Sequence, residues 1–133
     1  TFAADIEPLL RQCPGVKVIT TSRRPPVGMA AAVIEVPPFS LPPAESAGFN
    51  DISHCDAVQL FVDRAQVVRP DFTLGEDNAQ ELLTICRRLG GVPRTIELAA
   101  SRMRSMNTTR MLRKLDSIKV KDETGQAIYL IPR

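Results

Sequence analysis

One group of residues that could contact a phosphate lies at the end of a β-branched stretch near the start of the chain. Residues 16–21 (Val-Lys-Val-Ile-Thr-Thr) have the composition of a strand, and Ser22 and Arg23 follow them. In open α/β sheets ligands bind at the carboxyl ends of the strands, where hydroxyl groups and a guanidinium can hydrogen-bond a phosphate. We therefore predict a phosphate contact at Thr21, Ser22 and Arg23. The alternative is an exposed arginine in an ordinary loop.

A second group lies between two amphipathic stretches, in the run Arg88-Leu89-Gly90-Gly91-Val92-Pro93-Arg94. Glycine lets a backbone approach a ligand closely, and a proline ring offers a flat apolar face to an aromatic base. A helix that begins at Pro93 would also present the positive end of its dipole. Gly91, Val92 and Pro93 are therefore candidate nucleotide contacts, and the alternative is a plain corner between two helices.

Conventional catalytic and metal sites are not evident in the sequence. The P-loop pattern, the dinucleotide-binding glycine pattern and the nucleophile elbow are all missing from it. His54 is the single histidine, and Cys13 and Cys86 do not have ligand spacing relative to Cys55. We predict no catalytic residue and no metal site in this chain. The pair His54-Cys55 is then a pair of residues at the start of a helix.

Composition is ordinary for a globular domain, with 44% hydrophobic and 24% charged residues among 133. The net charge of +2 is too small to require nucleic acid or a membrane surface as a partner. An odd number of widely spaced cysteines favours a reducing compartment, and no apolar run is long enough to span a bilayer. We expect a cytoplasmic chain without a membrane partner. Its start, without methionine and inside a helical pattern, suggests excision from a longer protein.

The elements that must hold the first group form the first part of the chain. Residues 2–12 carry a helical apolar face, with Glu7 and Arg11 four positions apart, and Pro14-Gly15 ends that pattern. The strand at residues 16–21 and a second strand at residues 32–36 would follow. Together they predict part of a parallel α/β sheet with about two strands, in a domain over residues 1–44. Within this scheme residues 37–50 are an irregular linker.

The elements that must hold the second group are helical. Ser53 and Asp56 resemble one capping box, and Thr73 and Glu76 a second one. Helices are expected after Asp56, over residues 76–89, over residues 93–105 and from Thr108 onward. Four short helices predict an all-α bundle over residues 45–118, so the whole chain is mostly α. The tail, residues 119–133, contains one candidate strand at residues 127–131.

In this order the segments resemble a known family, the signal-transduction ATPases with numerous domains. More narrowly, they are similar to the NB-ARC-like (STAND) ATPases of bacterial transcriptional regulators in the AfsR and LuxR style. The resemblance covers most of the chain up to about Leu115. It is carried by residues 13–23 (CPGVKVITTSR), 36–42 (VPPFSLP), 57–65 (AVQLFVDRA), 85–93 (ICRRLGGVP) and 96–102 (IELAASR).

The resemblance implies a role for each group. Arg23 would be the sensor arginine that touches the terminal phosphate of ATP, and Gly91-Val92-Pro93 the segment whose proline packs on adenine. Residues 45–118 would be a helical lid that moves when ATP replaces ADP. Arg94 departs from the family pattern, which has leucine there. The P-loop and the acidic Mg²⁺ strand are absent from the sequence, so Mg²⁺ is expected only in a full-length parent ATPase, and this fragment should not hydrolyse ATP alone.

Two other functions stay open. Residues 76–89, the glycine turn and residues 93–105 mimic a helix–turn–helix, in which Arg94, Arg102 and Arg104 could contact DNA. Alternatively, the basic residues between 110 and 121 could dock a neighbouring protein, which makes the chain an interaction scaffold. If the chain is instead part of an ATPase switch, DNA is bound only through other domains of the parent. Open edges on the strand at residues 16–21 would favour self-association.

Overall fold

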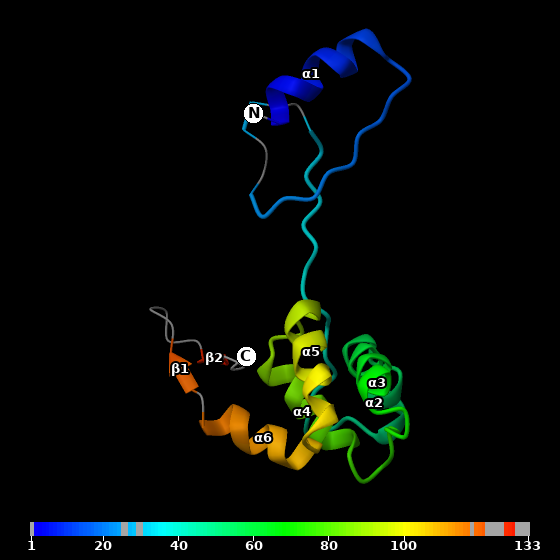
Figure 1. Ribbon diagram of the computed structural model, residues 1–133, viewed down its shortest axis with the longest axis vertical. Coiled ribbons are helices and arrows are strands. Elements are labelled where there is room, and N and C mark those ends of the chain that lie inside the picture. Colours follow the sequence, from blue (N-terminus) through cyan, green and yellow to red (C-terminus); the bar gives the residue numbers. More distant parts are fainter. Residues whose placement is uncertain (1, 25–26, 29–30, 118, 122–126, 130–133) are drawn as a thin grey trace. The chain divides into compact units, whose positions relative to one another are not determined.

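The computed structural model describes residues 2–24, 27–28, 31–117, 119–121 and 127–129 (Figure 1). The chain divides into two compact units, Thr1–Val36 and Pro37–Arg133. This division comes at residue 36, whereas the sequence places the boundary between residues 44 and 45. The reason is that residues 37–43 pack on the helices that follow them.

The first unit contains one helix, α1 (Phe2–Gln12). The ion pair expected between Glu7 and Arg11 is present, with 2.9 Å between Oε1 and Nη2. The helix ends where Pro14-Gly15 was expected to end it, and a turn follows in which the Val16 amide donates to the Cys13 carbonyl at 3.0 Å. From residue 4 to residue 36, none of the described residues is buried, so this stretch has no core of its own.

The two strands expected in this unit are not formed, and that part of the fold prediction was wrong. Residues 16–21 and 32–36 have no regular secondary structure, and Ile19 and Ile34 are 96% and 85% exposed. A β-branched run favours extended backbone, but a strand also needs neighbours that accept and donate its ladder hydrogen bonds. No partner strand lies beside either segment in the described part of the chain.

The second unit is helical, which confirms the prediction of a mostly α chain (Figure 1). Its helices are α2 (Phe49–Ser53), α3 (Asp56–Val68), α4 (Ala79–Arg88), α5 (Pro93–Ala100), the 3₁₀ turn η1 (Ser101–Arg104) and α6 (Thr108–Ser117). Helix α3 packs on α5 and η1, and α4 packs on α6 and α2. The strand hairpin β1 (Lys119–Lys121) and β2 (Ala127–Tyr129) follows, antiparallel, with Val120 opposite Ile128. β2 lies within the segment expected to contain a strand.

The core of this unit forms where the apolar stripes of the helices meet. Phe61 of α3 is fully buried, and its ring centroid lies 6.3 Å from that of Phe72. Side chains with less than 2% exposure come from every long helix except α6, and α6 contributes Met111 and Leu115. Helices this short are marginal alone in water, so this shared core provides most of their stability.

The helix starts differ from those expected. Ser53 ends α2 instead of capping α3, whose N-cap is Cys55. Helix α4 begins at Ala79, because the Asn78 side chain accepts from the Gly75 amide at 2.9 Å and donates to the Thr73 carbonyl at 2.8 Å. These bonds hold the preceding residues in a turn. The expected first residue of α5, Pro93, is confirmed. None of the described helices is long and apolar enough to cross a membrane.

Candidate functional site

The glycine turn between α4 and α5 is a rigid helix end. The Gly90 amide donates to the Arg87 carbonyl and the Gly91 amide to the Cys86 carbonyl, both at 3.0 Å. This pair of bonds is the Schellman motif, in which a residue after the helix adopts the left-handed conformation. Both glycines have positive φ, 70° and 66°. A residue with a Cβ would be strained at either position.

Gly91 has a second constraint, which comes from residues 37–43, here named the strap. The Phe39 amide donates to the Gly91 carbonyl at 2.9 Å. A Cβ built at Gly91 would lie only 2.5 Å from the Phe39 carbonyl oxygen, whereas at Gly90 its nearest neighbour would be a Val92 methyl at 3.8 Å. The sequence predicted a close approach to a ligand here, and the close approach that the structure contains is to the Phe39 backbone.

Val92 and Pro93 are the exposed part of this turn. Val92 is the extended N-cap of α5 and is 39% exposed, and Pro93 is the first residue of the helix and is also exposed. The Thr95 hydroxyl lies 2.9 Å from the Val92 carbonyl oxygen and fixes this helix start further. Arg94 points its guanidinium toward Glu97, with 4.0 Å between nitrogen and oxygen. Val92 and Pro93 therefore form an apolar surface beside the solvent-exposed guanidinium of Arg94.

Thr21, Ser22 and Arg23 lie in the first unit and are all exposed. The Ser22 hydroxyl accepts a hydrogen bond from the Arg24 amide at 3.2 Å, which shapes a local turn. Since the expected strand is not formed, these residues do not follow a sheet edge. The two predicted groups thus belong to different units.

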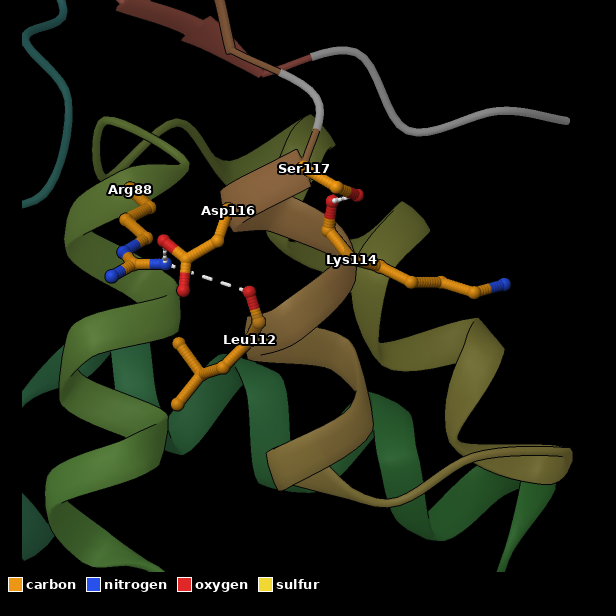
Figure 2. Close-up of polar contacts among 5 residues, drawn as sticks. All are labelled: Arg88, Leu112, Lys114, Asp116 and Ser117. Carbon is orange, nitrogen blue, oxygen red and sulfur yellow. Dashed lines mark hydrogen bonds and ion pairs between the residues drawn. The ribbon is translucent and has the colours of Figure 1, made fainter.

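Two arginines next to the glycine turn make contacts with distant segments, Arg88 within the candidate segment and Arg87 just before it. Figure 2 shows Arg88 of α4 contacting the Asp116 carboxylate of α6, while Lys114 extends away from α4. The Arg88 guanidinium also lies 3.5 Å from the Leu112 carbonyl oxygen. Arg87 donates to the Pro42 carbonyl in the strap. These partners are separated from the arginines by 24 to 45 positions, so no local sequence pattern could have indicated them.

His54 directly follows α2. Its Nδ1 is 2.8 Å from the Asn50 carbonyl oxygen, so this nitrogen donates and the ring caps the end of α2. His54 and Cys55 also line an open cleft of about 480 Å³ together with Ser40, Pro42, Pro43, Ser46, Ala47, Asn50, Asp51 and Asp56. None of the predicted nucleotide contacts lines this cleft. Among the described residues, no cluster of three or more metal-ligating side chains is present.

Among the described residues, Cys86 has a strongly shifted pKa. Burial in the core, with a smaller contribution from Cys55, raises the pKa of its thiol from 9.0 to about 12. The thiol lies 3.6 Å from the Ala57 carbonyl oxygen, toward which it can donate. Cys86 is therefore an unreactive core residue rather than a nucleophile.

This shift predicts a pH dependence of stability. A raised pKa in the folded state stabilises the protein fully below the pKa of the unfolded chain, and that contribution is lost between about pH 9 and pH 12. The difference in unfolding free energy between wild type and Cys86→Ala should therefore be constant up to about pH 9 and shrink above it. Urea denaturation of both proteins at several pH values measures this. A difference that stays constant to pH 11 would contradict it.

The chain resembles segments of longer mycobacterial proteins. Over 115 residues, 86% of the chain, it is 42% identical to an uncharacterized protein of Mycobacterium tuberculosis, of which the match covers 26%. Over 115 residues it is also 41% identical to a "Putative HTH-type transcriptional regulator" of Mycobacterium bovis, of which the match covers 12%. The chain thus spans about a quarter and about an eighth of these two relatives. No family model and no solved structure gives a significant match. The chain is accordingly similar to a segment that occurs in proteins of different length, including one named as a transcriptional regulator.

Proposed function

We propose that this chain is the sensor-and-lid portion of an ATP/ADP-dependent STAND switch in a transcriptional regulator. Arg23 would contact the terminal phosphate, with Thr21 and Ser22 beside it, and Gly91, Val92 and Pro93 would contact adenine. The observation that carries this proposal is the turn before α5. Its left-handed glycines hold two exposed apolar residues, Val92 and Pro93, in a fixed position at a helix start.

The similarity to a protein named as a transcriptional regulator supports the regulatory context. The exposed apolar residues of the first unit support the proposal that this unit packs against the rest of the parent ATPase domain. Ile19, Ile34 and Val36 are at least 85% exposed. Such residues would be buried if neighbouring strands completed a sheet around them. Without that partner, the same residues favour self-association of the isolated chain.

The proposal predicts nucleotide binding that depends on both groups. In a parent that contains this chain, Arg23→Ala and Pro93→Ala should each weaken binding of ATP or ADP about 10-fold or more. A charge-assisted contact is worth about 1.5–3 kcal/mol, and about 1.4 kcal/mol corresponds to tenfold in affinity. Titration calorimetry measures the affinities, with Arg23→Ala expected to affect ATP more than ADP. The chain alone should bind weakly and should not hydrolyse ATP.

Matched controls are available for both substitutions. Arg24→Ala removes the guanidinium next to Arg23. It keeps the hydrogen bond to the Ser22 hydroxyl, because the backbone amide of residue 24 donates that bond. Pro70→Ala removes an exposed proline that follows α3. Both controls should keep wild-type affinity. A wild-type parent without affinity for adenine nucleotides, or equal losses in variants and controls, would contradict the proposal.

The DNA-binding alternative is favoured only by the name of one group of relatives. Helix α5 has eight residues, and its Glu97 forms an ion pair with Arg64 at 3.2 Å. A carboxylate on the surface of a would-be reading helix opposes phosphate contact. Salt-dependent duplex binding by this chain that is lost in Arg94→Ala would support the alternative instead.

A further inference from the structure

We propose that Phe39 and Gly91 are positioning residues for the nucleotide site, and that strap and lid move as one body about a pivot within residues 33–36. This inference rests on the proposed function, since it concerns the same glycine turn. Neither residue needs to touch the nucleotide. They would act by holding Val92 and Pro93 in place.

The first step is the attachment of the strap to the bundle. The Phe39 amide is bonded to the Gly91 carbonyl at 2.9 Å, and the Arg87 guanidinium binds the Pro42 carbonyl from the same end of α4. The side chains of Phe39 and Leu41 pack against the core. Backbone and side chains of the strap are thus both fixed to the helices.

The second step is the place where the strap begins. Pro37 is the first residue of the second unit and directly follows Val36, which is 90% exposed. Residues 31–36 have no backbone hydrogen bond within the described part of the chain. Among the described residues, this segment thus lacks the hydrogen-bond restraints that Phe39 and Pro42 have. A change in orientation between the parent ATPase core and the helical lid, residues 45–118, would be absorbed before Pro37. The strap would carry this change directly to the glycine turn.

The neighbouring glycines provide a matched test. Both have positive φ, so alanine is strained at either position, but only alanine at Gly91 also collides with the Phe39 backbone. In the full chain, hydrogen exchange should show a protected Phe39 amide and unprotected amides at residues 33–36 in the wild type. Gly91→Ala should accelerate Phe39 exchange about 10-fold or more beyond its effect on global stability, and Gly90→Ala should not.

A second variant is needed because Gly91→Ala could unfold the bundle. Arg87 is exposed, so Arg87→Ala should leave the melting temperature within about 2 °C of wild type. It should nevertheless accelerate Phe39 exchange and, in the parent, weaken nucleotide binding about 3-fold or more, because the strap loses an anchor. A loss of affinity without a loss of stability separates positioning from a purely structural role.

The outcomes distinguish this inference from the proposed function. If the wild-type parent does not bind nucleotide, the proposed function fails and the positioning role with it, while Phe39 exchange still reports whether strap and turn move together. If nucleotide binds but Gly90→Ala and Gly91→Ala change Phe39 exchange equally, the positioning role is wrong. Amides of residues 33–36 that are protected from hydrogen exchange would show that the pivot does not lie there, which would overturn the proposed motion of strap and lid.

Discussion

Replacing Phe61 by alanine should lower the free energy of unfolding of the helical unit by about 3–5 kcal/mol, as expected for a buried Phe→Ala change. Phe61 is fully buried in α3, and its ring packs against Phe72 with 6.3 Å between centroids. The substitution removes that contact and leaves a cavity that short helices can only partly close. Urea denaturation followed by circular dichroism measures the change.

Phe49→Ala is the matched control for this substitution. Phe49 begins α2 and is 40% exposed, so its loss should cost below about 1 kcal/mol. Equal effects of the two substitutions would mean that the core is not centred on α3. The comparison also shows whether the bundle unfolds as a unit, since only then does a change in α3 shift the signal from all helices.

Replacing Glu81 by alanine should lower the free energy of unfolding by about 2–3 kcal/mol. The Glu81 carboxylate of α4 accepts hydrogen bonds from the Thr108 and Thr109 hydroxyls, at the start of α6. Thr108 is 6% exposed, so its hydroxyl would lose its partner in a buried position. Leaving a buried polar group unpaired costs about 1–3 kcal/mol, and hydrogen bonds to a charged group are the stronger ones.

The control for Glu81→Ala lies just before the same helix. Glu76→Ala removes an exposed carboxylate with no hydrogen bond or ion pair in the described part of the chain, and should change stability by less than about 0.5 kcal/mol. Glu81→Gln should lose less than Glu81→Ala, because an amide oxygen still accepts from the hydroxyls. An alanine variant as stable as wild type would show that α6 is held by apolar packing alone.

Helices α1, α3, α4, α5 and α6 could be predicted from sequence because each is defined by local information, whereas α2 (Phe49–Ser53) was not predicted and begins within the expected linker. Apolar residues at helical spacing on α3 and α4, the stop at Gly90 and the start at Pro93 depend only on residues within a turn of one another. The exact starts of α3 and α4 could not be predicted, since the N-caps are Cys55 and Asn78 instead of the residues of the expected capping boxes, and the Asn78 side chain holds the residues before α4 in a turn. The strand prediction failed for a related reason, because β propensity does not supply a partner.

At the candidate site the sequence predicted that Gly90 and Gly91 form a turn, that the backbone there could approach a ligand closely, and that Pro93 begins a helix. It did not determine what approaches Gly91. The tertiary structure decided that this is Phe39, from a segment more than 50 positions earlier, and that Arg88 binds Asp116 while Glu81 binds Thr108. A residue's own torsional preferences are encoded locally, whereas its partners across the fold depend on how all the apolar faces pack together.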